Sequence, residues 1–258
     1  MNEIRKITII GAGCVANAFA EEMHAKGFVI SEIVGRREEA VLKLAAKVDA
    51  HPNIADYQNI NTTSDLYILS VKDHVIHELA PLIKTFNKLL VHTSGSVDMK
   101  VLAAGSTNYG VLYPLQTFSR ERKPDFAEIP FFVIANTRES EQLLYNFAST
   151  LSQRVEILDD EKRRVIHLSA VFTCNFTNYM LTHAKGIMDT ADLDFQLMKA
   201  LAKETINKAF DNGPEYSQTG PAKRNDKSII KRHLAMLSKD RRKLYDLISK
   251  MIIKDYNA

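Results

Sequence analysis

The 258-residue sequence predicts an α/β domain built on a parallel sheet, followed by a smaller all-α C-terminal domain. Two observations support this fold class. Near the N-terminus, an apolar strand at 7–10 runs directly into a G-x-G-x-x-A motif that opens a helix. Strand and helix signals then alternate as far as Leu158, after which only helical periodicity is found. We therefore expect two domains, at residues 1–158 and 159–258.

The glycine motif predicts a site for a dinucleotide. Gly11 permits a tight turn, Gly13 leaves no side chain in front of a pyrophosphate, and Ala16 lets the helix pack closely on the strand. A helix at 15–26 and a strand at 28–34 complete a βαβ unit of the length that a Rossmann-like doubly wound sheet requires. The alternative is a chance glycine turn in another α/β protein. The residues expected to contact the cofactor here are Gly11, Ala12, Gly13, Cys14, Val15 and Ala16.

The end of the second strand favours NADP (NADPH) over NAD as the cofactor. An acidic residue at this position would bind the ribose 2′-hydroxyl of NAD, and none is present. Arg36 and Arg37 follow the strand instead, and guanidinium groups suit a 2′-phosphate. The alternative is that both arginines only solvate the loop before a helix at 38–48.

The α/β alternation continues with apolar strands at 66–71 and 89–92, separated by a helix at 74–86 that Asp73 can cap. Ligands of open parallel sheets bind beyond the carboxyl ends of the strands. Ser96 either contacts the substrate or caps a short helix at 98–103, and the sequence leaves both open. The further residues expected beside the cofactor are Ser70, Val71, Lys72, Thr93, Ser94 and Gly95.

Strands at 109–113, 130–135 and 154–158, with a helix at 138–151, extend the sheet. The segment 114–130 contains three prolines and reads as an irregular loop, and such loops often line sites. Tyr113 and Gln116 stand where strand meets loop, so we consider both as substrate contacts. Ordinary loop hydrogen bonding is the alternative for each.

The C-terminal part opens with a predicted helix at 160–188, on which polar groups share one face. His167, Cys174 and Asn178 recur at helical spacing, and Asn175 lies on the flank. Reduction of a C=O or C=N bond by hydride needs an acid and a polarising donor. His167 would be the acid, and Asn175 or Asn178 the donor. Structural hydrogen bonds to backbone or to a partner subunit are the alternative.

A polar loop between helices at 193–211 and 227–238 holds two further candidates for substrate binding, Thr219 and Arg224. The Arg224 guanidinium could hold a substrate carboxylate, and Asp226 could cap the next helix. The segment 223–243 is basic, which raises the question of nucleic acid. The net charge is only +3 and apolar residues give the segment a core face, so we expect a solvated helix and no nucleic-acid partner.

The composition is ordinary for a globular protein, with 45% hydrophobic and 25% charged residues. No apolar run approaches the ~20 residues of a membrane span, and no signal peptide is evident, so we expect a cytoplasmic protein without membrane contact. Cys14 and Cys174 provide neither a disulfide framework nor a metal-ligand spacing. We therefore expect no bound metal.

Several of these motifs together resemble one family. The chain is similar to proteins that pair a Rossmann-like NADP-binding domain with a C-terminal domain of unknown function 2520, and more distantly to pyrroline-5-carboxylate reductases, 3-hydroxyisobutyrate dehydrogenases and deazaflavin-dependent NADP oxidoreductases. Two positions depart from the family pattern, since Tyr113 stands where histidine is usual and Asn225 where glycine is usual. The segments that carry the resemblance are 11–13, 70–73, 92–96, 113–118, 167–175, 219–226 and 233–234.

The resemblance implies an NADP-dependent oxidoreductase that forms a homodimer through its helical domain. Combined with His167 and Arg224, it predicts hydride transfer to or from a small carboxylate-bearing oxo or imino substrate. The alternative function is a non-catalytic NADP-binding sensor or interaction module. The sequence excludes neither.

Overall fold

A computed structural model describes residues 3–257, and its internal contacts divide the chain into two compact units, 1–174 and 175–258. The sequence places the end of the sheet domain at Leu158, and the last strand does end at Ile157. The first unit nevertheless extends further because the following helix packs on the sheet, where Ile166 contacts the cluster of Val111, Tyr113 and Phe132.

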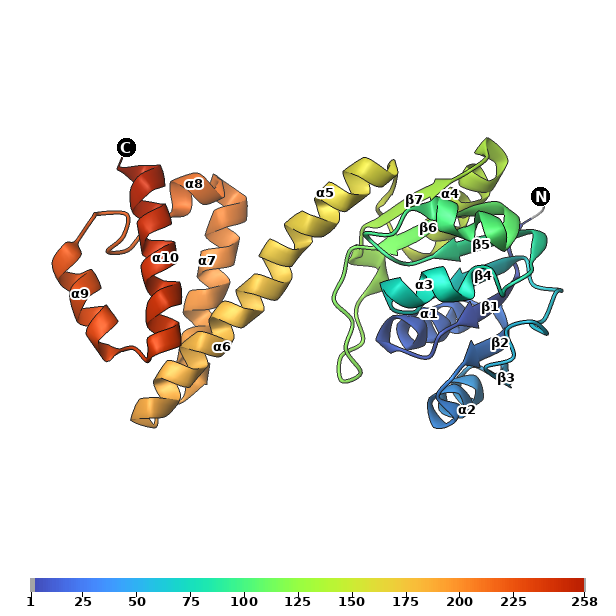
Figure 1. Cartoon of the computed structure of the whole chain (residues 1–258), viewed down its shortest axis with the longest axis horizontal. Helices are drawn as coiled ribbons and strands as arrows, with labels where there is room; N and C mark the ends of the chain where they lie inside the picture. The colour runs from blue at the N-terminus through green and yellow to red at the C-terminus, as the bar shows by residue number, and fades with distance from the viewer. Residues whose placement is uncertain (1–2, 258) are drawn as a thin grey trace. The chain divides into compact units, whose positions relative to one another are not determined.

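The first unit is a Rossmann-like eight-stranded sheet in the order β3-β2-β1-β4-β5-β6-β7-β8 (Figure 1). Neighbouring strands are parallel except β6 and β7, which are antiparallel. This arrangement confirms the predicted fold class. The strands are β1 Lys6–Ile10, β2 Val29–Gly35, β3 His51–Ile54, β4 Leu66–Leu69, β5 Phe86–His92, β6 Ser106–Pro114, β7 Phe131–Ala135 and β8 Val155–Ile157.

Helices cover both faces of this sheet. Apolar residues of α1, α2 and α4 form one core cluster with β1, and α3 contributes to a second cluster on the opposite face. Phe19 of α1 is fully buried and meets Phe126 and Phe131 edge-on at 5.7 and 5.8 Å between ring centroids. The helices are α1 Cys14–Ala25, α2 Glu38–Lys47, α3 Asp73–Leu79, α4 Arg138–Leu151 and α5 Asp160–Ala170, with 3₁₀ turns at Met99–Ala104 and Phe126–Glu128.

Three local features differ from the sequence prediction. The helix α3 ends at Leu79 rather than at residue 86, and Asp73 is not its cap, since Lys72 occupies that position. Strand β3 was not predicted, because its four residues show no apolar alternation. The stretch Val171–Phe176 is π-helical, so the regular spacing that aligned His167 with later residues does not hold through it.

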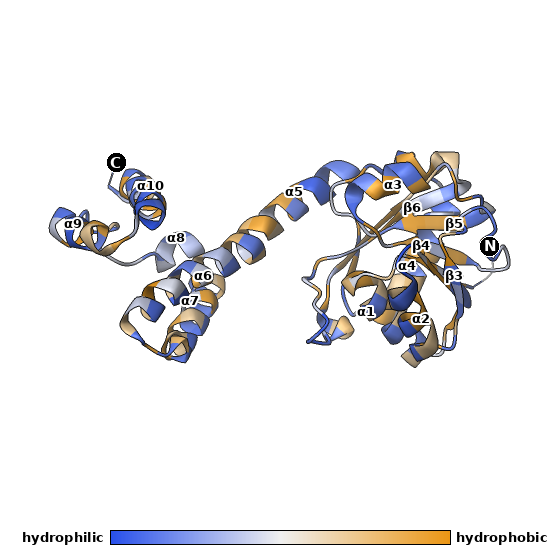
Figure 2. Ribbon diagram, turned by 60° about the horizontal axis from the view of Figure 1, so that its bottom comes forward, coloured by the Kyte–Doolittle hydropathy of each residue, from blue (hydrophilic) through white to orange (hydrophobic). Residues whose placement is uncertain are grey.

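The second unit is helical and has almost no core. Among its described residues only Ala222 and Ser249 are buried. Phe210 is 80% exposed and Leu201 63% exposed, and apolar residues recur along its helices in Figure 2. Asp226 caps α9, as predicted, by accepting a hydrogen bond from the Ile229 amide. The helices are α6 Thr177–Met188, α7 Lys199–Asn212, α8 Pro214–Ser217, α9 Lys227–Met236 and α10 Lys239–Tyr256, with 3₁₀ turns at Asp189–Ala191 and Phe195–Met198.

None of the helices within residues 3–257 has both the length and the apolar character needed to cross a membrane.

Candidate functional site

A cavity of about 700 Å³ lies within the first unit, at the carboxyl ends of β1, β2, β4 and β5. Of the residues predicted to bind the cofactor, all line this cavity except Ala16, which is fully buried behind the glycine loop. His167 and Tyr113 line its other end. The sequence did not indicate six further lining residues, Gly35, Tyr57, Asp73, His74, Val75 and Leu79.

The glycine loop has the geometry that a bound pyrophosphate requires. Gly11 has φ +130°, donates its N–H to the Val34 carbonyl at 2.8 Å, and has no room for a side chain because a Cβ would overlap the Ser70 carbonyl oxygen. A Cβ on Gly13 would meet nothing within 4 Å, so it would project into the open cavity. Gly13 is also the N-cap residue of α1, and no side-chain hydrogen bond caps the first amides of that helix. These residues therefore fit a dinucleotide.

Replacing Gly13 by valine is expected to abolish measurable nucleotide binding without unfolding the protein. The added side chain meets no protein atom but occupies the space in front of the α1 amides. Calorimetric titration with NADPH and a thermal unfolding curve measure the two effects. Ala25→Val, at the exposed end of the same helix, is the control and should bind normally. Unchanged affinity in Gly13→Val would show that the nucleotide does not use this loop.

The two arginines after β2 are exposed at the opposite end of the cavity from His167. The Arg37 guanidinium donates to the Ala12 carbonyl at 3.4 Å, which holds it beside the glycine loop. Burial raises the pKa of Tyr57, and the positive charge of Arg36 partly opposes this effect. The charge of Arg36 therefore acts on Tyr57. The sequence did not indicate Tyr57, because it belongs to no motif and follows strand β3, which was not predicted.

His167 and Tyr113 form a hydrogen-bonded pair, with 3.1 Å between the Tyr113 hydroxyl and Nδ1 of His167. Gly95 makes this contact possible, since a Cβ there would lie 2.6 Å from Nδ1 and 2.8 Å from Cζ of Tyr113. Burial raises the pKa of Tyr113, so its hydroxyl keeps its proton and can donate it to Nδ1. In that arrangement Nε2 of His167 carries the ring N–H.

A buried arginine that the sequence did not indicate holds the adjacent loop in place. Arg163 is 1% exposed, donates to the carbonyls of Gly95 and Val97, and forms an ion pair with Asp160 at 2.7 Å. Burial and the positive charge of Arg163 lower the pKa of His92 to about 3, so this histidine stays neutral. Its Nδ1 accepts the amide of Ser94 at 3.2 Å.

The serines of this loop are engaged in structural hydrogen bonds. The hydroxyl of Ser94 accepts the amides of Ser96 and Val97 at 3.1 Å each. The Ser96 hydroxyl donates to Asp73 at 2.5 Å. Asp98, not Ser96, caps the short 3₁₀ helix. The sequence left open whether Ser96 caps this helix or contacts the substrate, and the capping role is now excluded.

The other residues predicted for substrate binding or catalysis lie outside this cavity. Gln116 is exposed and its side-chain oxygen accepts the Thr117 amide. Asn175, Asn178 and Arg224 are exposed residues of the second unit, and Thr219 lines a separate apolar cavity there. Their functional roles stay predictions. In the described part of the chain no group of three or more histidine, cysteine, aspartate or glutamate side chains is arranged to hold a metal.

The fold and the cavity together define a Rossmann-type protein of the nicotinamide-dependent oxidoreductase class. Comparison with known families agrees with this class. Residues 6–94 match the family described as NADP oxidoreductase, coenzyme F420-dependent, and residues 129–252 match the domain of unknown function 2520. The chain belongs to the family that combines these two domains, as the resemblance in its motifs implies.

Solved structures with this architecture include a candidate NADP oxidoreductase from Bacteroides fragilis, which is 41% identical over 98% of both chains with a TM-score of 0.91. A protein from Thermotoga maritima is 20% identical, covering 98% of this chain and 100% of that chain, with a TM-score of 0.79. A pyrroline-5-carboxylate reductase from Coxiella burnetii is 15% identical, covering 99% and 98%, with a TM-score of 0.56. The last two show the fold alone. No curated protein matches the chain.

Proposed function

We propose that the protein is an NADP-dependent oxidoreductase that transfers a hydride to or from a small carboxylate-bearing oxo or imino substrate. One observation carries this proposal. A single cavity is lined by the glycine loop, by two arginines after β2 and by the hydrogen-bonded His167–Tyr113 pair. A cytoplasmic location is part of the proposal and fits the free thiols of Cys14 and Cys174.

The cofactor supplies the hydride when bound, and the chain supplies its orientation and the movement of a proton. The amides at the start of α1 bind the pyrophosphate, and Arg36 and Arg37 bind the 2′-phosphate. His167 in its imidazolium form gives the Nε2 proton to the substrate oxygen or nitrogen and is left as the neutral ring, while Tyr113 fixes the ring orientation through Nδ1. Arg224 as the carboxylate clamp, and Asn175 or Asn178 as a second donor, remain part of the proposal.

The double variant Arg36→Ala, Arg37→Ala is expected to bind NADPH about 100-fold more weakly than the wild type, because two charge-assisted hydrogen bonds to phosphate are lost. Its affinity for NADH should change by less than about threefold, since NADH lacks the 2′-phosphate. Calorimetric titration of both proteins with both nucleotides measures this difference. Equal losses for NADPH and NADH would contradict the assigned specificity, and no binding of either nucleotide by the wild type would overturn the proposed function.

We also propose that the helical unit forms a homodimer. A unit in which Ala222 and Ser249 are the only buried residues up to position 257 cannot offset its conformational entropy alone, and a second copy is the expected cover for its apolar surface. Light scattering should give twice the 29.1 kDa chain mass for the wild type. The variant Leu201→Glu, Phe210→Glu should lose this association, whereas Leu82→Glu, an exposed apolar position of the first unit, should retain it. A monomeric wild type would refute the dimer.

A further inference from the structure

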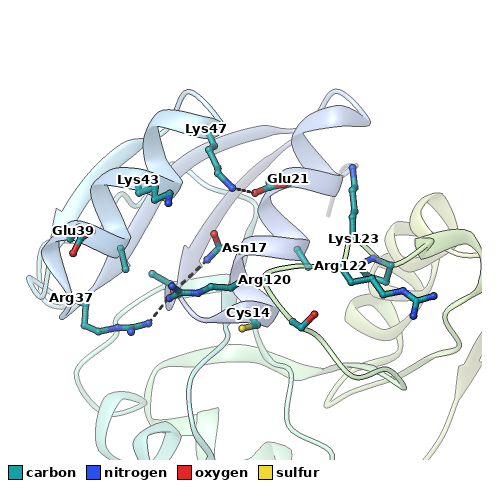
Figure 3. Close-up of a pocket in the computed structure, with 15 residues that line it drawn as sticks. Cys14, Asn17, Glu21, Arg37, Glu39, Lys43, Lys47, Arg120, Arg122 and Lys123 are labelled. Atoms are coloured by element: carbon teal, nitrogen blue, oxygen red, sulfur yellow. Dashed lines mark hydrogen bonds and ion pairs between the residues drawn. The ribbon is translucent and has the colours of Figure 1, made fainter. Parts of the chain in front are cut away.

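A second cavity, of about 340 Å³, lies beside the cofactor cavity in the first unit, lined by α1, α2 and the loop after β6 (Figure 3). Arg37 lines both cavities. The cationic side chains that line the second cavity are Arg37, Lys43, Lys47, Arg120, Arg122 and Lys123, and its acidic side chains are Glu21 and Glu39. We call it the cationic cavity.

The acidic groups leave much of this positive charge uncompensated. Lys47 is paired with Glu21 at 2.5 Å, and Lys123 lies 3.7 Å from Glu22. For Lys43, Arg120 and Arg122, no carboxylate among residues 3–257 lies within 4.0 Å. Like charges gathered around one cavity repel each other, so an anion bound there would be favoured.

The loop that carries Arg120 is fixed against α1 on both sides of the cationic segment. Phe118 and Phe126 flank Ser119–Pro124, and their rings lie 6.4 and 5.7 Å from that of Phe19. In Figure 3 the Arg120 side chain extends from this loop toward Arg37, whereas Arg122 extends away. Lys43 reaches the same cavity from α2. Arg37 and Lys43 belong to the N-cap and body of α2, and Arg120 belongs to the loop after β6, so two segments distant in the sequence supply the three cations.

We propose that the cationic cavity is a binding site for a phosphate monoester, held by Arg37, Lys43 and Arg120. Each guanidinium can donate two parallel hydrogen bonds to two oxygens of one phosphate, and the lysine ammonium adds a further donor. This set of donors therefore suits a dianionic phosphate better than a single carboxylate. The phosphate has two possible sources. One is the 2′-phosphate of NADP bound in the adjoining cavity, a source that rests on the proposed function, and the other is a separate phosphorylated molecule.

Calorimetry on four proteins distinguishes these sources. Wild type, Arg120→Ala, Lys43→Ala and the control Arg122→Ala, which changes the net charge of the same loop equally, are each titrated with NADPH and with NADH. Each protein saturated with NADPH is then titrated with inorganic pyrophosphate, the probe for a separate phosphate. The control should behave as the wild type in every titration.

Two results support the proposal. If Arg120→Ala and Lys43→Ala each weaken NADPH binding about tenfold or more and leave NADH unchanged, the cavity holds the 2′-phosphate. If NADPH affinity is unchanged but pyrophosphate binds the wild type and not these variants, the cavity holds a separate phosphate. If neither variant differs from Arg122→Ala with any ligand, the proposal is overturned. Failure of the wild type to bind either nucleotide would instead overturn the proposed function, and pyrophosphate titrated into the same four proteins without nucleotide would still decide this one.

Discussion

Replacing Arg163 by alanine is expected to lower the free energy of unfolding by about 3–5 kcal/mol, the usual cost of removing one partner of a buried ion pair. The side chain is 1% exposed and contacts two loop carbonyls as well as Asp160, so three interactions are lost together. Urea denaturation at one fixed protein concentration measures the change. Arg164→Ala, the exposed neighbour, should be nearly neutral.

The destabilisation should also depend on pH. Burial raises the pKa of Asp160, and the charge of Arg163 opposes that rise, so removal of Arg163 raises the pKa further. An acid whose pKa is raised in the folded state costs stability when ionised, and this cost disappears once the pH falls below its unfolded pKa. The variant should therefore be less destabilised in mild acid than at neutral pH. If the loss of stability is the same in mild acid and at neutral pH, the unpaired Asp160 carboxylate is not the cause of the destabilisation.

His167→Ala is expected to lower turnover by about 100-fold to 10,000-fold, the range for loss of a general acid or base, while NADPH affinity remains near that of the wild type. The assay follows NADPH oxidation with whichever oxo or imino acid in a panel the wild type reduces fastest. Tyr113→Phe, which keeps the ring but removes the hydroxyl on Nδ1, should lose less activity than His167→Ala. Full turnover in His167→Ala would remove this residue from the mechanism.

The same assay separates the enzyme from the alternative of a non-catalytic sensor. A sensor would bind NADPH through the glycine loop and the arginines and show no hydride transfer to any member of the panel, with a deazaflavin included. For such a sensor, His167→Ala would cause no change in turnover, because the wild type has none. Binding and turnover thus test different residues of one cavity.

Features encoded in short stretches of sequence were predicted well. The glycine loop depends on a few adjacent residues, and α4 begins and ends as predicted at Arg138 and Leu151, with Thr137 as a capping residue before it. Strand β3 was missed because it lies at the sheet edge and contains Pro52, with no apolar alternation to mark it.

Contacts between distant residues could not be predicted in the same way. The pair of Tyr113 with His167 spans 54 residues, and Arg163 reaches Gly95 across 68. Both pairs form only because α5 packs on the sheet, a tertiary event without a local sequence signal. Arg163 in particular reads as one of many surface charges on an amphipathic helix until its burial is seen.

The crowding around Gly95 gives one position a diagnostic value. A Cβ on this residue would lie 2.6 Å from Nδ1 of His167 and 2.8 Å from Cζ of Tyr113, so any other amino acid would displace one of the two rings. We therefore expect a homologue with a side chain at this position to lack the histidine–tyrosine contact, even where it keeps both rings. The residue at this one position therefore predicts which homologues can form the contact.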